Sequence, residues 1–183
     1  MNRQWLSVGV IGLVLAGLIG AGWMVKDRFL PVEVGTAAPD FTATDLEGRR
    51  VSLSDLDGEV VLLNIWATWC PPCIEEMPSM QRLYRQLGPE GLKIVAVSVD
   101  AELGRSDASG KIGGDIRRFV DEMGLTFDIW HDPDGSIQQT YRTTGIPESF
   151  VIDRDGNIVR KDIGGKLWDS EERLESIRRL LEQ

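Results

Sequence analysis

The order of apolar and polar positions divides this chain of 183 residues into unlike parts. Residues 6–25 are uncharged and mostly apolar, and two shorter apolar runs follow at residues 60–67 and 92–99. Short apolar runs are typical of strands that are buried on both faces of a sheet. The pattern therefore predicts a domain built on a buried sheet, preceded by a long hydrophobic segment.

A helix is predicted between the two apolar runs. Apolar residues recur at helical spacing from Met77 to Leu87, and Gly88 and Pro89 end the pattern. Pro78 falls inside this helix and is expected to kink it, because proline removes one backbone hydrogen bond. A strand, a helix and a second strand imply a right-handed crossover and a parallel pair.

The rest of the chain reads as mixed α/β with an antiparallel end. Segment 101–114 is rich in glycine, serine and charge, and it is predicted to be a flexible surface loop. We expect strands at 41–44 and 49–53, a helix at 115–123, a strand at 127–130, a short helix at 137–141, a hairpin of strands 149–153 and 158–163, and a last helix capped by Asp169 with Glu172.

The hydrophobic segment at residues 6–25 is long enough to cross a bilayer core of roughly 30 Å. Trp5 and Trp23 bracket it, as aromatic residues do at membrane interfaces. A cleaved signal peptide, with its cleavage site at residues 20–22, is the alternative. We expect residues 1–28 to be a membrane anchor or signal peptide, 29–40 a linker and 41–183 the folded domain.

The net charge and the length of the chain limit the kinds of partner and the number of domains that we expect. The formal net charge is −9, which argues against a nucleic-acid partner and favours basic protein surfaces. The roughly 150 residues after the hydrophobic segment suit one globular domain with a full core. We therefore expect a single acidic domain without a nucleic-acid partner.

The only two cysteines of the chain stand two residues apart, in Trp69-Cys70-Pro71-Pro72-Cys73, directly after an apolar run. If a helix begins at Cys70, its free N–H groups and dipole favour a thiolate there, so the sequence predicts a redox dithiol. Two prolines withhold N–H donors, and we therefore expect this thiol to ionise only moderately more readily than usual. A structural disulfide, a zinc half-site and two unpaired buried cysteines are the alternatives.

Four segments together resemble the thioredoxin-like family, in particular its membrane-anchored TlpA and ResA branch and the reductases of cytochrome c maturation. The resemblance covers residues 34–182. Its segments are Gly35-Thr36-Ala37-Ala38-Pro39-Asp40-Phe41, Leu63 to Cys73, Gly145-Ile146-Pro147-Glu148-Ser149-Phe150, and Val151-Ile152-Asp153-Arg154-Asp155-Gly156.

The resemblance implies a three-layer α/β fold with a central mixed β-sheet, an N-terminal hairpin extension and a central insertion, preceded by one transmembrane helix. It implies that Cys70 attacks a partner disulfide and Cys73 resolves the mixed disulfide, with no metal and no bound cofactor. Pro147 falls where the family has a cis-proline beside the dithiol, although an ordinary trans proline is the alternative. Trp69, Ile146, Pro147 and Glu148 are then the residues expected to contact substrate.

Glu76 lies one helical turn after Cys73, where ResA-type relatives have a glutamate that moves protons to or from the thiols. Thioredoxins instead carry a buried aspartate at the place of Asn64, which cannot titrate. A solvated glutamate on the helix surface is the alternative for Glu76. Glu75 points elsewhere and is expected to have no special role.

The resemblance implies a membrane-tethered thiol-disulfide oxidoreductase of the cell (inner) membrane, single-pass, with its catalytic domain on the periplasmic side. It would reduce partner proteins with cysteine pairs, apocytochrome c being the best candidate, and receive electrons from a membrane donor of the DsbD or CcdA type. The alternative is an extracytoplasmic copper chaperone that uses Cys70, Cys73 and His131. A peroxiredoxin is set aside, because Leu63 and Ala67 stand where that family requires proline and threonine or serine.

Overall fold

The computed structural model describes residues 15–17, 20, 32–107 and 109–183. Most of the predicted membrane segment 6–25, and the first residues of the predicted linker, lie outside these residues. In the described part of the chain, no helix has the length and apolar character needed to cross a membrane. Residues 32–183 form one compact unit, and the fold described below is that of this unit.

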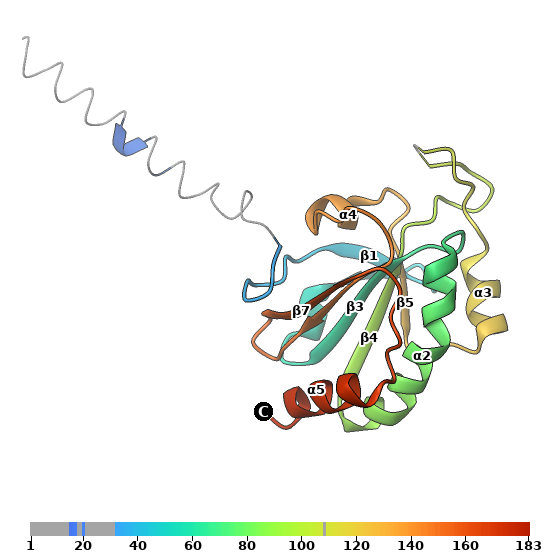
Figure 1. The fold of residues 1–183 in the computed structure, drawn as a ribbon. Helices are drawn as coiled ribbons and strands as arrows, with labels where there is room; N and C mark the ends of the chain where they lie inside the picture. The colour runs from blue at the N-terminus through green and yellow to red at the C-terminus, as the bar shows by residue number, and fades with distance from the viewer. Residues whose placement is uncertain (1–14, 18–19, 21–31, 108) are drawn as a thin grey trace, which may run out of the picture. The chain divides into compact units, whose positions relative to one another are not determined.

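Seven strands and four helices of this unit follow the order that the sequence predicts (Figure 1). Their bounds agree with the predicted ones to within a few residues. In chain order they are β1 Thr42–Asp45, β2 Arg50–Ser52, the 3-10 helix η2 Leu53–Leu56, β3 Val60–Trp66, α2 Pro71–Leu87, the 3-10 helix η3 Gly88–Glu90, β4 Leu92–Ser98, α3 Ile116–Met123, β5 Asp128–His131, α4 Ser136–Thr140, β6 Glu148–Ile152, β7 Ile158–Ile163 and α5 Glu171–Leu181.

The strands form one mixed sheet in the order β2-β1-β5-β4-β3-β6-β7. The central strand β3 pairs in parallel with β4 and antiparallel with β6. All seven residues of β3 are buried, which explains its unbroken apolar pattern. The predicted α/β fold with a mixed central sheet is confirmed. The predicted N-terminal hairpin is β1 and β2, and it joins the sheet because β1 pairs with β5.

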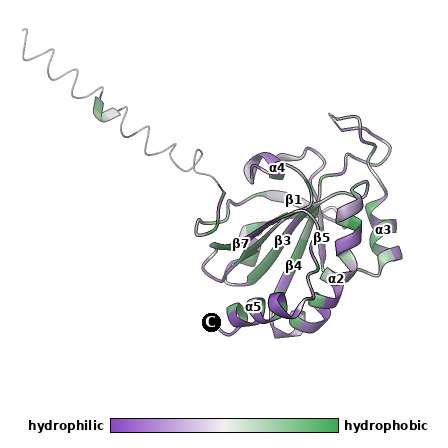
Figure 2. Ribbon diagram, in the orientation of Figure 1, coloured by the Kyte–Doolittle hydropathy of each residue, from purple (hydrophilic) through white to green (hydrophobic). Residues whose placement is uncertain are grey.

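Helices cover both faces of the sheet. Ser149 and Phe150 are neighbours in β6 and therefore point to opposite faces. Ser149 faces α2 through its bond to Asn64, whereas Phe150 stacks on Tyr141, which directly follows α4. Trp66 lies two residues after Asn64 in β3 and packs against Phe119, which places α3 on the α2 face. Arg173 of α5 lies over the ring of Trp168, which bonds to Glu76 of α2, so α5 lies on that face too. Figure 2 shows that these helices carry both apolar and polar positions, as expected for helices with one buried side.

Two details differ from the simplest reading of the sequence. Asp169 was expected to cap the last helix, and this is wrong. The N-cap residue of α5 is Ser170, and Asp169 instead accepts a 2.6 Å bond from Nε of Arg82. In addition, part of the segment assigned to the linker is hydrogen-bonded to the domain, because the N–H groups of Gly35 and Ala38 donate to carbonyl groups at residues 158 and 156.

Candidate active site

The two cysteines lie where β3 leads into α2. Cys70 is the N-cap residue of α2, and Pro71 and Pro72 occupy its first turn, as the sequence predicts. Cys70 and Cys73 form a disulfide with their Cα atoms 5.3 Å apart, so this is the oxidised form. The alternative of two unpaired buried cysteines is therefore wrong. Cys70 keeps 4% of its surface exposed and Cys73 none, so a partner has some access to Cys70 only.

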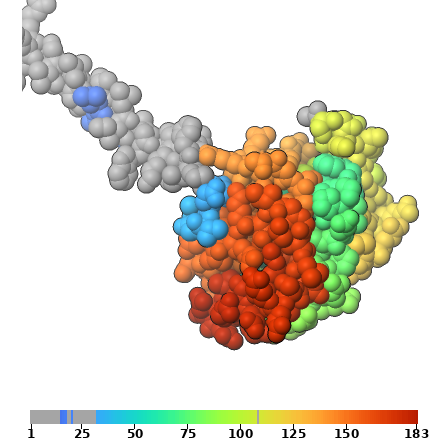
Figure 3. Space-filling model, in the orientation of Figure 1, coloured from blue at the N-terminus to red at the C-terminus, as the bar shows by residue number. Residues whose placement is uncertain are grey.

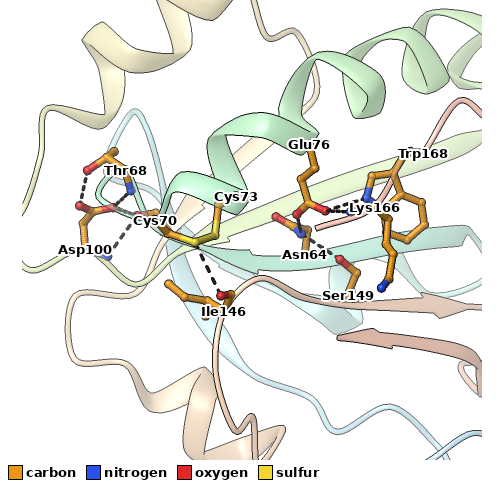
Figure 4. Close-up of a disulfide and its surroundings, with 11 residues drawn as sticks. Asn64, Thr68, Cys70, Cys73, Glu76, Asp100, Ile146, Ser149, Lys166 and Trp168 are labelled. Carbon is orange, nitrogen blue, oxygen red and sulfur yellow. Dashed lines mark hydrogen bonds between the residues drawn. A yellow bond between two sulfur atoms is a disulfide. The ribbon is translucent and has the colours of Figure 1, made fainter. Parts of the chain in front are cut away.

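A cis-proline lies beside the disulfide. The peptide bond between Ile146 and Pro147 is cis, as predicted. The carbonyl oxygen of Ile146 is 3.6 Å from Sγ of Cys70 (Figure 4). The carbonyl of Pro147 accepts a 2.8 Å bond from the N–H of Gly164, which fixes the proline loop to the end of β7. The chain segments that the resemblance assigns to substrate contact are therefore brought together around Cys70.

Trp69 lies at the border between the dithiol and segment 101–114. Its side chain is half-buried, and Nζ of Lys111 lies 5.5 Å from the centroid of its indole ring. An open groove of about 650 Å³ runs beside Trp69, with residues from 99–109 on one wall and residues 133–139 on the other. Segment 101–114 itself carries two isolated β-bridges, Leu103 with Gly113 and Ser106 with Ile112.

Asp100 joins this segment to the turn before the dithiol (Figure 4). Its side chain is fully buried, and its two oxygens accept four hydrogen bonds. Thr68 donates from its backbone N–H at 2.8 Å and from its hydroxyl at 2.5 Å, Gly114 donates from its N–H at 3.0 Å, and Ser98 from its hydroxyl at 2.7 Å. Gly114 must be glycine, because a Cβ there would lie 2.1 Å from Oγ1 of Thr68.

Glu76 is buried beneath the dithiol helix, with 3% of its surface exposed. The alternative of a solvated glutamate is therefore wrong. Oε1 accepts a 2.8 Å bond from Nδ2 of Asn64, and Oε2 accepts bonds from the N–H of Lys166 at 3.0 Å and from Nε1 of Trp168 at 3.2 Å. Asn64 also donates to the hydroxyl of Ser149 at 2.9 Å, and its own Oδ1 is buried without a hydrogen-bond partner. Figure 4 shows this cluster beside the disulfide.

Two opposing effects act on the protonation of Glu76. Burial raises its pKa, because an ionised carboxylate is poorly solvated there. The hydrogen bonds from Lys166, Asn64 and Trp168 lower it, and the positive charge of Lys166 does so too. The net direction is upward. A buried carboxyl group with a raised pKa, one helical turn from Cys73, is able to exchange a proton with a thiol.

The side chain of Glu148, one of the residues expected to contact substrate, is buried at the start of β6. Its side chain is 1% exposed and points away from Glu76, since it belongs to the opposite face of β6 from Ser149. Nζ of Lys161 lies 3.2 Å from its Oε1, close enough for an ion pair though not aligned for a hydrogen bond. Its Oε2 accepts a 3.3 Å bond from the N–H of Thr144. This bond ties Glu148 to the loop that carries the cis-proline.

His131, Glu75 and Trp66 have the surroundings of structural or surface residues. His131 places Nε2 2.8 Å from the carbonyl oxygen of Asp100, and Glu75 is exposed. Trp66, at the end of β3, is fully buried and packs against Phe119 of α3, so it belongs to the core. Within the described residues, no three His, Cys, Asp or Glu side chains are grouped to hold a metal ion.

Sequence reasoning missed Asp100, Lys166 and Trp168. A signal existed for Asp100, because a charged residue directly after a buried strand lies at the carboxyl edge of the sheet, where sites form. No local signal exists for Trp168, whose partner Glu76 is 92 residues away in the chain.

Comparisons with known proteins agree with this geometry. The model of the AhpC/TSA family matches residues 34–161. Among curated proteins, the thiol-disulfide oxidoreductase ResA of Geobacillus thermodenitrificans is 39% identical over an alignment of 184 positions, which covers 97% of this chain and 99% of that protein. ResA of Bacillus thuringiensis subsp. konkukian is 36% identical over 164 residues, 87% of each chain.

Solved structures give the same picture. A crystal structure from Chlorobium tepidum, provisionally identified as the thiol:disulfide interchange protein DsbE, has a TM-score of 0.70 and 33% identity and covers 82% of this chain and 99% of that one. The crystal structure of StoA from Bacillus subtilis has a TM-score of 0.59 and 28% identity, over 77% of this chain and 97% of that one.

Proposed function

The chain belongs to the AhpC/TSA family of thioredoxin-like proteins and is a thiol-disulfide oxidoreductase of the ResA and DsbE type, and on that premise we propose that it reduces disulfides in partner proteins from a membrane tether outside the cytoplasm. The observation that carries the proposal is the placement of Cys70, the more exposed of the two cysteines at 4%, at a helix N-terminus, with a buried carboxyl group one helical turn from its partner cysteine. The reaction needs no cofactor other than the dithiol itself.

The exchange proceeds in two steps. The thiolate of Cys70 attacks one sulfur of the partner disulfide, forms a mixed disulfide and releases the other partner sulfur as a thiolate. Cys73 then gives its proton to Glu76 and attacks Sγ of Cys70, which releases the second partner sulfur and forms the disulfide seen in this structure. Two electrons pass to the partner, and its sulfurs leave as thiols once protonated.

Reduction is favoured over oxidation by the first turn of α2. Pro71 and Pro72 have no N–H group, so fewer backbone donors stabilise a thiolate at Cys70 than in a helix without them. A less stable thiolate makes the disulfide a weaker oxidant. The test of direction is the reduction potential of the pair. A value near about −120 mV, where DsbA-type oxidants lie, would overturn the proposed direction.

The proposed location and partners depend on the hydrophobic segment and on the family. Residues 6–25 would anchor the protein as a single-pass segment of the cell (inner) membrane, with the catalytic domain on the periplasmic side. Apocytochrome c before haem attachment is the proposed substrate, and a membrane protein of the DsbD or CcdA type is the proposed electron donor. Fractionation of cells should recover the full chain with membranes after a carbonate wash. Recovery in the soluble fraction would overturn the tether.

The central experiment is trapping of the mixed disulfide. Cys73→Ala lacks the resolving thiol and should leave Cys70 covalently joined to its partner, as a band that disappears on reduction. Cys70→Ala is the matched control and should trap nothing, because Cys73 is fully buried. If Cys70→Ala traps a partner while Cys73→Ala does not, the assignment of the attacking cysteine is wrong. A peptide with an oxidised Cys-x-x-Cys-His motif, typical of haem attachment, tests the proposed substrate class.

A further inference from the structure

Two of the three hydrogen bonds to the carboxyl group of Glu76 come from one short segment between β7 and α5. The N–H of Lys166 and Nε1 of Trp168 both donate to Oε2. The side chain of Trp168 has no exposed surface, and Glu76 has 3%. The bond between these two side chains is therefore shielded from water, where a hydrogen bond to an ionised group is strong.

The segment that carries these donors is fixed against the active site at several points. The N–H of Gly164 donates to the carbonyl of Pro147, and Gly165 packs on the backbone of α2, since a Cβ there would lie 2.9 Å from the carbonyl oxygen of Pro72. The N–H of Trp168 donates to Oγ of Ser79 at 3.0 Å. Figure 3 shows the orange to red part of the chain, which includes this segment, directly beside the green α2.

The indole ring of Trp168 is held on its other side by α5. The guanidinium carbon of Arg173 lies 4.6 Å from the ring centroid, and Arg173 is itself held by two 2.9 Å hydrogen bonds to Asp162. The ring is thus fixed between α5 and α2. Its N–H group is aimed at Oε2 of Glu76 by contacts from both helices.

All three hydrogen bonds to the carboxyl group of Glu76 come from N–H donors. An indole N–H and a backbone N–H donate and cannot accept, so both favour the ionised carboxylate over the protonated acid. Burial favours the acid. The protonation of Glu76 therefore depends on how many of these donors are in place, and Trp168 is the one side-chain donor that the Gly164–Trp168 segment supplies.

We propose that Trp168 is a positioning residue of the dithiol reaction, whose indole N–H sets the pH at which Glu76 takes up or releases the proton that it exchanges with the thiols. This inference rests on the proposed role of Glu76. Trp168 touches neither sulfur nor substrate and acts through the carboxyl group alone.

Other charged groups also face Glu76 and are kept constant in the test. Lys166 faces it from the same segment, and its Nζ donates to the carbonyl of Ile163. Arg173 faces it from α5, and the two interact electrostatically. From the sheet, Asn64 and Ser149 are uncharged. On α2 itself, Glu75 is exposed. Cys70 and Cys73 form the disulfide here, whereas in the reduced protein used for alkylation their thiols titrate near Glu76 and are the same in every variant compared.

The test compares Trp168→Phe, Glu76→Gln and the double variant with the wild type, as the full chain in detergent. The alkylation rate of the reduced protein by iodoacetamide is followed from pH 4 to pH 10. We expect Glu76→Gln to remove one inflection from the wild-type profile. Trp168→Phe should move that inflection up by about one pH unit, a tenfold change in proton affinity. In the Glu76→Gln background, Trp168→Phe should change nothing further.

The matched control is Trp130→Phe, which makes the same chemical change at a buried tryptophan that packs on Phe41. It should leave the inflection unmoved. If Glu76→Gln leaves the profile unchanged, the proton role of Glu76 fails and this inference fails with it. If Glu76→Gln acts but Trp168→Phe matches Trp130→Phe, only the inference is overturned.

A second measurement is made on wild-type protein, so it does not depend on whether Trp168→Phe folds. In wild-type protein with ¹⁵N-labelled tryptophan, the indole N–H signal of Trp168 should shift with pH in the oxidised form and should stop doing so in Glu76→Gln. An indole signal that does not respond to pH across the titration of Glu76 would overturn the inference.

Discussion

Removal of the side chain of Asp100 should lower the free energy of unfolding of the oxidised protein strongly, because this side chain accepts four hydrogen bonds. Each of its two oxygens accepts one backbone N–H and one hydroxyl: Oδ1 from Gly114 and Thr68, and Oδ2 from Thr68 and Ser98. Hydroxyl groups can turn to other acceptors, but the two backbone N–H groups cannot. A buried donor without a partner costs about 1–3 kcal/mol.

Asp100→Ala leaves both backbone donors without a partner, so the expected loss in the free energy of unfolding is about 2–6 kcal/mol. Asp100→Asn keeps one acceptor oxygen and turns an amide NH₂ toward the other donors, so about 1–3 kcal/mol is expected. Thr68→Val removes only one hydroxyl donor, at 2.5 Å from Oδ1, and should lose about 1 kcal/mol. We expect the loss in unfolding free energy to be largest in Asp100→Ala and smallest in Thr68→Val.

The assay is urea unfolding of the oxidised full chain in detergent, followed by tryptophan fluorescence. Asp155→Asn, an exposed loop residue, is the control and should change the unfolding free energy by less than about 0.5 kcal/mol. A loss of under about 1 kcal/mol in Asp100→Ala would refute the reasoning, since it would mean that the four bonds are replaced at little cost.

Two further predictions concern the C-terminal part of the domain. Burial would raise the pKa of Asp162, but hydrogen bonds and charge from Arg173 and Arg160 outweigh it and lower that pKa, so its stabilising effect is lost as pH falls through the lowered value. Asp162→Asn should therefore lose less stability than wild type between about pH 5 and pH 2 in thermal unfolding, and equal losses would contradict this. Gly165→Ala should cost about 1–3 kcal/mol in urea unfolding, because its Cβ meets the Pro72 backbone. Gly145→Ala, with no atom within 4 Å of its Cβ, is the control, and an equal cost in both would show that the contact is irrelevant.

The elements whose formation depends on local pattern followed from the sequence. The apolar run at β3 and the helical spacing from Met77 to Leu87 each record burial along the chain, and burial repeats with the period of the element. The cis bond at Pro147 followed from the resemblance, since no local pattern distinguishes it from a trans proline. The predicted cap of α5 was wrong, because Asp169 forms an ion pair with Arg82 on α2 instead.

The sequence by itself determined the sheet, the dithiol at the start of a helix and the glutamate one turn later. Only the tertiary structure decided what that glutamate touches, because its donors at Lys166 and Trp168 are 90 and 92 residues away in the chain. The bonds of Asp100 to Thr68 likewise cross 32 residues. Periodicity shows which positions are buried, whereas the partners of a buried polar group depend on which segments the folded chain brings to within about 3 Å.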